Sequence, residues 1–313
     1  MTLLEGLERE LRRVCPHLEL RKNEPMSRHT SFRIGGPAAL MALPREEEAE
    51  MVLETAFRCN VTPFFLGNGS NLLVSDDGYD GFVVKLTGAY SGGEVSANEL
   101  TAGGGMLLSQ AASLALKHGL TGLEWAAGIP GTVGGAVTMN AGAYGGEISQ
   151  TLYQVHTLGF DGRAGVVPNR ECDFSYRHSA FSDGKRLILE AVFLLAPDDP
   201  AAIRARMADL SAQRKAKQPL EYPSAGSTFK RPAPAVGPDG QPQPVYAAAL
   251  IDQCGCKGLR IGGAMVSEKH AGFIVNTGGA TCADVLALME EVKKRVFAQT
   301  GVELEAEVKR LGV

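Results

Sequence analysis

The sequence contains no apolar run of the roughly 18 residues that a membrane-spanning helix needs. Residues 1–10 carry acidic side chains where a secretion signal has basic residues ahead of an apolar stretch. Positive charge is not in excess, because 31 lysines and arginines stand against 35 acidic residues. Nucleic-acid binding needs such an excess to neutralise phosphates. These absences predict a cytoplasmic protein that binds neither membranes nor nucleic acid and shows no sign of an obligate protein partner.

Cysteine and histidine are also scarce, with six residues of each type. Cys254 and Cys256 lie close together, but their spacing is not the CxxC of redox motifs, and the second half of a zinc site is missing. We therefore predict reduced structural thiols and no metal centre. His29 and His270 are predicted to pack or to form hydrogen bonds.

The sequence has the composition of a soluble globular enzyme, with 44% apolar and 21% charged residues. Its 313 residues favour two or three subdomains. Periodicity and capping residues predict helices at 3–14, 45–59, 107–118, 199–217 and 281–299. Strands are predicted at 63–66, 72–74, 153–158 and 187–195. The proline-rich residues 232–244 are predicted to form an exposed loop, and the basic cluster 204–217 a solvated helix face or a small anion site.

Glycine is concentrated in two loops, GNGSN at 67–71 and GIPGTVGGAVTMNAGAYGG at 128–146. Glycine inside regular structure costs roughly 0.5–1 kcal/mol relative to alanine, so this density needs a reason. A frequent reason is a bulky ligand, often a phosphate, that approaches backbone N–H groups. The two loops together predict a ligand with a pyrophosphate, that is, a dinucleotide. The alternative for either loop alone is a tight turn.

The context of the first loop argues against a Rossmann fold. That fingerprint needs a third glycine after Gly67 and Gly69 and a helix directly behind it. Here residues 72–74 predict a strand and residues 76–78 a turn.

Six motifs follow one another along the chain. They are NEPMSRHTSFRIGGP at 23–37, LGNGSNLLV at 66–74, AGIPGTVGG at 127–135, YRHS at 176–179, PSAGSTFK at 223–230 and LEAEV at 304–308. Their order and content resemble those of the UDP-N-acetylenolpyruvoylglucosamine reductases. No single motif is decisive, but the ordered set is specific and covers nearly the whole chain.

The resemblance implies an α+β fold. Its FAD-binding part would have the two-subdomain architecture of vanillyl-alcohol-oxidase (PCMH-type) enzymes, and a C-terminal α+β domain would bind the substrate. The expected domains are an N-terminal helix and lead-in at 1–24, an FAD-binding domain at 25–200 with subdomains of about 25–95 and 96–200, and a substrate-binding domain at 201–313.

The resemblance also implies a reaction with non-covalent FAD and with NADPH as reductant. The enolpyruvyl ether of UDP-N-acetylglucosamine enolpyruvate would be reduced to UDP-N-acetylmuramate, a step of peptidoglycan precursor synthesis and hence of cell wall biogenesis, cell shape and cell division. No separate nicotinamide fingerprint is visible, so the preference for NADPH over NADH rests on the resemblance alone.

Hydride addition to an enol ether requires that the attached carboxylate draws the developing negative charge, which is an electrostatic task. Arg177 matches the family's arginine, and its planar guanidinium suits a carboxylate. Glu307 matches the family's functional glutamate. Beside the substrate carboxylate it must hold a proton, a state that a like charge and partial burial favour. Ser227 matches the family's proton donor to carbon.

The remaining implied contacts are with FAD and with the substrate. The FAD contacts lie in the two glycine-rich loops: Gly67, Asn68, Gly69, Ser70, Asn71, Gly131, Thr132, Gly134 and Gly135. The substrate contacts are Tyr176, Lys230 and Arg231. Arg231 stands where many members have asparagine, so its contact is open. Only residues 180–186 separate the YRHS motif from the next strand, which is typical of the subgroup without a tyrosine-bearing lid loop.

Two rival functions remain at this point. One is an oxidase on the same flavin scaffold, although loop 67–71 has neither the histidine nor the cysteine that often binds flavin covalently. The other is a flavin- or nucleotide-binding protein without catalysis. Both leave Arg177, Ser227 and Glu307 unexplained.

Overall fold

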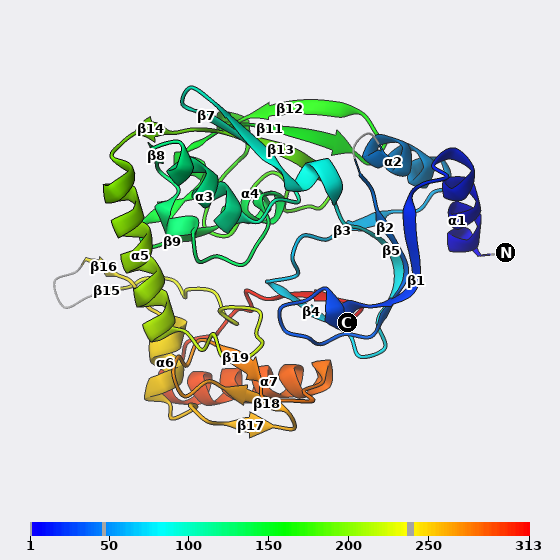
Figure 1. Cartoon of the computed structure of the whole chain (residues 1–313). Coiled ribbons are helices and arrows are strands. Elements are labelled where there is room, and N and C mark those ends of the chain that lie inside the picture. The colour runs from blue at the N-terminus through cyan, green and yellow to red at the C-terminus, as the bar shows by residue number, and fades with distance from the viewer. Residues whose placement is uncertain (1, 46–47, 237–240) are drawn as a thin grey trace. The chain divides into compact units, whose positions relative to one another are not determined.

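The computed structural model of the chain describes residues 2–45, 48–236 and 241–313 (Figure 1). The helices are α1 (Leu3–Val14), α2 (Glu48–Arg58), α3 (Leu108–Lys117), α4 (Val133–Thr138), α5 (Pro200–Lys217), α6 (Ala247–Gln253) and α7 (Cys282–Thr300). The strands are β1 (Glu19–Pro25), β2 (Pro37–Leu43), β3 (Pro63–Phe65), β4 (Leu72–Val74), β5 (Tyr79–Val84), β6 (Gly93–Ser96), β7 (Glu99–Gly103), β8 (Leu120–Thr121), β9 (Gly142–Ala143), β10 (Gly146–Glu147), β11 (Leu152–Gly159), β12 (Ala164–Pro168), β13 (Arg186–Leu194), β14 (Ala196–Pro197), β15 (Ala235–Val236), β16 (Pro242–Gln243), β17 (Arg260–Ile261), β18 (Ala264–Val266), β19 (Ile274–Asn276) and β20 (Lys309–Leu311).

The five helices predicted from the sequence are present as α1, α2, α3, α5 and α7. The last of them shows why the prediction works. The Thr281 hydroxyl accepts a hydrogen bond from the N–H of Asp284 at 3.0 Å, and the predicted apolar face is buried along the whole helix. The four predicted strands are present as β3, β4, β11 and β13. Residues 46–47 of the second predicted helix and residues 237–240 of the predicted proline-rich loop lie outside the described residues.

The chain folds into two compact units made of interleaved segments. Unit 1 consists of residues 1–24, 38–68 and 80–214, and unit 2 of residues 25–37, 69–79 and 215–313. The two units are defined by which residues contact one another. The domains expected from the sequence, with boundaries at 24/25 and 200/201, are defined by the ligand that each would bind, so those boundaries stay a prediction.

Unit 1 contains two sheets with separate cores. The first sheet has the strand order β1-β2-β5-β3, with β3 parallel to β5. Helices α1 and α2 pack against each other beside it, and leucines of both helices are fully buried in this core, among them Leu7, Leu11 and Leu53. The amphipathic pattern of residues 3–14 therefore has its explanation in the packing of α1 on α2.

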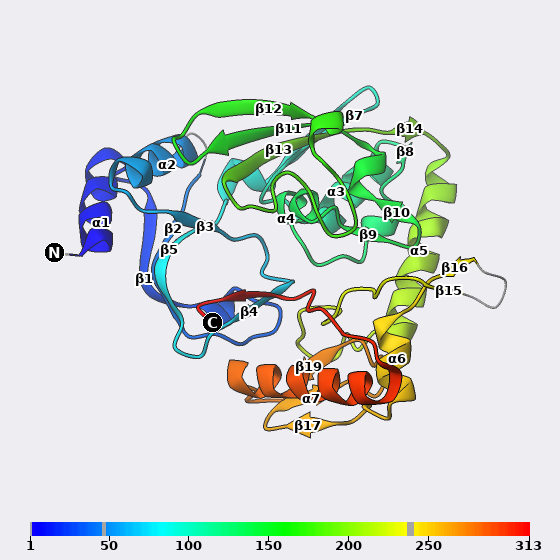
Figure 2. The same ribbon diagram turned by 180° about the vertical axis from the view of Figure 1, so that it is seen from behind.

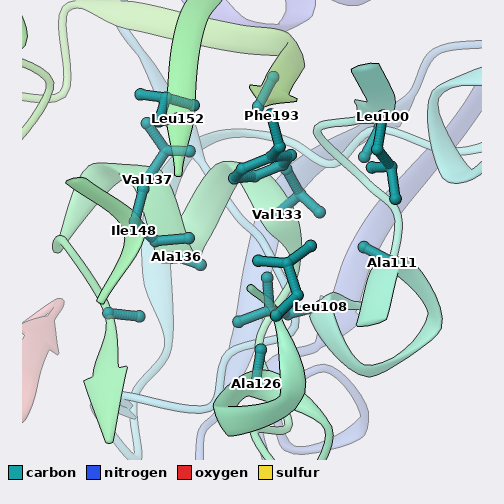
Figure 3. Close-up of a cluster of buried hydrophobic side chains, with 14 of the residues drawn as sticks. Leu100, Leu108, Ala111, Ala126, Val133, Ala136, Val137, Ile148, Leu152 and Phe193 are labelled. Atoms are coloured by element: carbon teal, nitrogen blue, oxygen red, sulfur yellow. The ribbon is translucent and has the colours of Figure 1, made fainter. Parts of the chain in front are cut away.

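The second sheet of unit 1 has the order β12-β11-β13-β7-β6 and is antiparallel throughout. Helices α3 and α4 lie on one of its faces (Figure 1). Figure 3 shows Val133 of α4 between Leu108 of α3 and Phe193 of β13, and Val137 beside Leu152 of β11. The apolar residues of α4 are thus buried, which fixes the end of the loop that precedes this helix.

Unit 2 is built around α7. The three-stranded sheet β17-β18-β19 lies along this helix (Figure 2), and the buried face of α7 packs on β17 and β18. A separate parallel pair joins β20 to β4, with Lys309 opposite Leu72. Asp76, in the turn after β4, accepts hydrogen bonds from the N–H groups of Cys282 and Ala283 at 2.7 and 3.0 Å and so binds the first turn of α7.

The cysteines and histidines have structural surroundings. All six cysteines are free, and all but the half-buried Cys59 are buried. The N–H of Gly272 donates to Nδ1 of His270, whose ring meets Phe273 edge-on, so the packing and hydrogen-bonding role predicted for His270 is confirmed. Among the described residues there is no group of acidic, histidine and cysteine side chains that could hold a metal ion. Within the same residues, no helix is long and apolar enough to cross a membrane.

Candidate active site

The two glycine-rich loops meet within unit 1. The side-chain amide of Asn68 donates a hydrogen bond to the carbonyl of Pro130 at 2.6 Å. A Cβ atom on Gly67 would lie 2.6 Å from the hydroxyl oxygen of Thr132, so only glycine allows this approach. The loops that are expected to share one pyrophosphate are therefore neighbours, joined by the Asn68 amide and by the close approach of Gly67 to the Thr132 hydroxyl. In this respect the residues present fit a dinucleotide.

The backbone donors at the start of α4 are already in use. The N–H of Val133 donates to the carbonyl of Met106 at 2.8 Å, that of Gly134 to Gly104 at 2.9 Å, and that of Gly135 to the Thr132 hydroxyl at 3.2 Å. A Cβ on Gly134 would come within 3.0 Å of the Gly104 carbonyl oxygen. Part of the glycine density thus serves close packing of backbone on backbone.

The FAD contacts assigned to this stretch stay a prediction, and so do those assigned to loop 67–71. Gly67 and Asn68 belong to unit 1, whereas Gly69, Ser70 and Asn71 belong to unit 2. Sequence analysis did not single out residues 103–105, a run of three glycines that begins with the last residue of β7. Such a run indicates a close approach between backbone segments, and Gly104 approaches Gly134 in this way.

Arg177 lies in a tight turn of unit 1. Ser175 and His178 exchange both backbone hydrogen bonds at 3.1 Å, so Tyr176 and Arg177 form the tip of the turn. Arg177 has a positive φ of 58°, and its guanidinium lies 5.0 Å from the centre of the Tyr176 ring. Positive charge stacks favourably on an aromatic face. The predicted pair Tyr176 and Arg177 is therefore brought together by the turn itself.

The glycine-rich stretch fixes the base of this turn. The side-chain amide of Asn140 donates to the carbonyl of Ser175 at 3.3 Å, and the hydroxyl of Ser179 donates to the carbonyl of Thr138 at 2.7 Å. Asn140 and Ser179 are both buried. The end of α4 and the chain that follows it thus position the turn that carries Arg177, a role of residues 138–140 that sequence analysis missed.

Ser227 and Glu307 lie close together in the chain fold of unit 2. The carbonyl of Thr228, next to Ser227, accepts a hydrogen bond from the N–H of Glu307 at 2.8 Å. Phe229 and Ala306 then pair as an antiparallel bridge. Ser227 is half-buried, and Glu307 is buried with only 8% of its surface exposed. The two predicted catalytic groups of this unit are therefore held on neighbouring extended segments.

Glu307 and the nearby Glu305 differ in how much of each side chain is exposed. The Glu305 side chain is 74% exposed and forms an ion pair with Lys230 at 3.0 Å. Glu307, in contrast, is buried. The assignment of Glu307 in preference to Glu305 is consistent with this difference in burial. Lys230, predicted to bind substrate, is partly engaged by Glu305, and the guanidinium of Arg231 stacks 5.1 Å from the Tyr246 ring.

Arg214, near the end of α5, was noticed in the sequence only as part of a basic cluster. Its Nε atom is buried and has no hydrogen-bond partner among the described residues. A Cβ on Gly128 would lie 2.8 Å from its Cδ, so the side chain lies directly against the glycine-rich stretch. Burial lowers the pKa of this guanidinium, and the nearby Tyr144 opposes that shift. Buried polar groups without partners are rare, so this cation is a candidate for anion binding.

An ion-pair cluster fixes α5 on unit 1. The buried Glu124 accepts hydrogen bonds from Nε and Nη2 of Arg206 at 3.0 and 2.8 Å, from the Thr121 hydroxyl at 2.6 Å and from the N–H of Gly122 at 2.8 Å. Arg206 also pairs with Asp198. This cluster, in the same unit as Arg214, sets the course of α5 beside the glycine-rich stretch.

Replacing Glu124 by glutamine is expected to lower the free energy of unfolding by about 1–3 kcal/mol, because the charge-assisted bonds to Arg206 are lost. Burial would raise the pKa of Glu124, but the hydrogen bonds from Thr121, Gly122 and Arg206 outweigh it, and the pKa is lowered. A carboxyl with a lowered folded-state pKa stabilises the fold above its unfolded-state pKa. That contribution disappears as the pH falls through the folded-state value.

The thermal unfolding of wild type and Glu124→Gln should therefore converge as the pH falls from neutral to below about 4, near the ordinary pKa of glutamate. The exposed Glu94 of β6 offers a matched control, since Glu94→Gln should change stability little at any pH. A stability difference for Glu124→Gln that did not depend on pH would contradict this account.

Comparisons with known proteins find relatives along almost the whole chain. Residues 218–311 match the family model described as UDP-N-acetylenolpyruvoylglucosamine reductase, C-terminal domain, and residues 37–163 match the FAD binding domain. The UDP-N-acetylenolpyruvoylglucosamine reductase of Agathobacter rectalis is 45% identical over 95% of this chain and 95% of its own. That of Caldanaerobacter subterraneus is also 45% identical, over 99% of both chains.

A solved structure agrees with these relatives. The crystal structure of the UDP-N-acetylenolpyruvylglucosamine reductase from Thermus caldophilus matches with a TM-score of 0.78 and 35% identity, over 94% of this chain and 99% of that one. The fold predicted from the sequence is thereby confirmed. It is α+β, with an FAD-binding part of the vanillyl-alcohol-oxidase (PCMH) type and a C-terminal α+β domain.

Proposed function

Because the chain belongs to the UDP-N-acetylenolpyruvoylglucosamine reductase family, we propose that it reduces the enolpyruvyl ether of UDP-N-acetylglucosamine enolpyruvate to UDP-N-acetylmuramate. As a member of this family the chain is an FAD-dependent oxidoreductase that acts in peptidoglycan synthesis. NADPH is proposed as the reductant and the roles of individual residues are proposed below. The observation that carries these roles is the hydrogen bond between Thr228 and Glu307, which holds the segments of the proton donor and the acid side by side.

The residues that would hold FAD are those of the two loops that meet in unit 1. They are Gly67 and Asn68 from one loop and Gly131 and Thr132 from the other, and the contacts of Gly67 with Thr132 and of Asn68 with Pro130 support this proposal. When bound, FAD supplies the hydride that it has accepted from NADPH. The protein's own task is to make the substrate's C=C bond electrophilic and to deliver a proton.

Arg177 is proposed to bind the carboxylate of the enolpyruvyl group. A guanidinium offers two parallel N–H donors to a carboxylate and keeps its charge, so it withdraws electron density from the adjacent C=C bond. As hydride reaches the terminal carbon, negative charge gathers on the carboxylate oxygens, and the fixed cation stabilises it. Glu307, protonated, is proposed to donate a hydrogen bond to the same charge. A buried carboxyl next to a carboxylate favours its neutral form.

Ser227 is proposed to protonate the second carbon. An enediolate carbon is a strong base, so a half-buried hydroxyl can act as its acid when a hydrogen-bonded route replaces the proton. Gly226 before it has a positive φ of 75°, which sets the turn that presents Ser227. The product is the lactyl ether, formed by adding one hydride and one proton across the former double bond.

The substrate diphosphate needs cations, and Arg214 is proposed to be one of them, in addition to Lys230 and Arg231. Replacing Arg214 by methionine keeps much of the buried volume but removes the charge. The KM for the UDP-sugar is expected to rise about 10- to 100-fold, because a charged hydrogen bond contributes about 1.5–3 kcal/mol.

Steady-state kinetics with varied UDP-sugar would measure this change. Arg204→Met is the matched control, since Arg204 lies on an exposed part of α5. An unchanged KM in Arg214→Met would remove Arg214 from the substrate site.

The proposed function is tested by NADPH oxidation with purified, FAD-loaded protein, in the presence and absence of UDP-N-acetylglucosamine enolpyruvate. Consumption of NADPH that depends on the sugar nucleotide, with formation of UDP-N-acetylmuramate, is the expected result. NADPH oxidation that consumes oxygen and ignores the sugar nucleotide would support the oxidase alternative instead.

A further inference from the structure

Both backbone polar groups of Glu307 form hydrogen bonds. Its N–H donates to the carbonyl of Thr228 at 2.8 Å, and its carbonyl accepts a hydrogen bond from the side-chain amide of Asn71 at 3.2 Å. Thr228 is itself fixed, because its N–H donates to Gly272 at 2.8 Å and its hydroxyl accepts from the N–H of Ile274 at 3.1 Å. The backbone beneath the Glu307 side chain is therefore located by two partners from distant parts of the sequence.

The hydrogen bond from the Asn71 side chain to Glu307 lies just outside the paired strands β4 and β20. The parallel ladder between β4 and β20 begins at Leu72 and Lys309, and the carbonyl of Asn71 accepts from the N–H of Lys309 at 3.0 Å. Glu307 precedes this ladder and follows the isolated bridge between Phe229 and Ala306. Its carbonyl lies outside both regular segments, and a side chain takes the place of a strand partner.

We propose that Asn71 is a positioning residue for Glu307, which it serves by fixing the Glu307 carbonyl and so the course of the chain that carries the acid. The inference rests on the acid role proposed above for Glu307. It also gives Asn71 a task in unit 2 that differs from the flavin contact expected from its place in the first glycine-rich loop.

The side-chain chemistry at position 71 follows from this task. Asparagine supplies an N–H donor on a short stem. An ionised aspartate of the same shape only accepts hydrogen bonds and would repel the Glu307 carbonyl. Alanine would leave that carbonyl without its partner. Either change removes one of the two hydrogen bonds that hold the Glu307 backbone, and a displacement of about 1 Å at a reacting group can cost about 100-fold in rate.

The test is a double-mutant cycle of Asn71→Ala and Glu307→Ala in FAD-loaded protein. Asn71→Ala alone is expected to lower kcat about 10- to 100-fold with little change in KM. In the Glu307→Ala background the same substitution should lower kcat by less than twofold, because residues that act as a unit are not additive. Multiplicative losses, or a loss of FAD affinity in Asn71→Ala, would overturn the proposal in favour of a flavin contact.

A second readout does not depend on catalysis. With ¹³C-labelled glutamate carboxyls, the Glu307 resonance is identified by its absence in Glu307→Gln. We expect that resonance to shift in Asn71→Ala and Asn71→Asp, while an unchanged resonance in both would overturn the proposal. Asn276→Ala is the control, because Asn276 bonds Phe32, Gly278 and Ala280 in the same unit. It should reduce thermal stability and leave the Glu307 resonance in place.

The two proposals can fail separately. Wild-type protein that is inert toward the UDP-sugar would refute the proposed function, and the carboxyl resonance would still decide whether Asn71 positions Glu307. Wild-type protein that turns over normally, together with an unaltered resonance in both Asn71 variants, would refute the positioning role alone.

Discussion

Ser227→Ala is expected to lower kcat about 10²- to 10⁴-fold, the range typical of a lost general acid. The fall should be confined to the half-reaction with the UDP-sugar. Reduction of the bound flavin by NADPH, followed as the bleaching of its absorbance in a single turnover, should proceed at the wild-type rate. A hydroxyl that gives its proton to carbon has no part in that first half-reaction.

The neighbouring Ser224 provides the matched control for Ser227. The Ser31 hydroxyl donates a hydrogen bond to the backbone carbonyl of Ser224 at 2.6 Å, and the Ser224 side chain takes no part in this bond. Ser224→Ala preserves this carbonyl and should keep both half-reactions near their wild-type rates. Full turnover in Ser227→Ala would mean that water or another side chain protonates the substrate.

Arg177→Gly should separate loss of function from loss of stability. We expect kcat/KM for the UDP-sugar to fall about 10²- to 10³-fold, the effect of removing one group that stabilises an oxyanion. Stability should not fall, because Arg177 has a φ of 58°, a conformation that costs a non-glycine residue roughly 1 kcal/mol or more. Glycine adopts it without strain. Thermal unfolding and steady-state kinetics on the same preparation measure both quantities.

Asp173→Gly is a close control for this experiment. Asp173 also has a positive φ, 47°, in the exposed chain just before the turn, so glycine relieves a similar strain there without removing a proposed catalytic group. Its kinetics should stay close to those of wild type. The role of Arg177 would be refuted by an Arg177→Gly enzyme that retains the wild-type kcat/KM.

Local patterns in the sequence were sufficient to predict the five helices and four strands named above. The predicted helix at 281–299 corresponds to α7, Cys282–Thr300, because its cap and its apolar face are both encoded within the segment itself. The motif at 176–179 likewise produced a compact turn that places Tyr176 against Arg177. Local structure that depends only on the residues of one segment could therefore be predicted.

Roles that depend on distant partners could not be predicted in this way. Nothing near Asn71 in the sequence indicates that its amide bonds residue 307, which is 236 positions away. The close approach of Gly134 to Gly104 could not be predicted either, because Gly104 lies in a different loop. For Arg214 the sequence left a solvated face and a small anion site both open, because the burial of its Nε atom is a property of the folded chain.

The interleaving of the two units has a consequence for biosynthesis. Strand β4 emerges early in translation and must wait for β20, whose pairing with it closes a very long loop. Such late, non-local contacts slow folding. Unit 2 also contains the last three residues of the loop 67–71, so this loop can take its final form only after the residues around Glu307 have been synthesised. On a ribosome, the nascent chain would therefore be expected to acquire its flavin last, after nearly all of the polypeptide has been made.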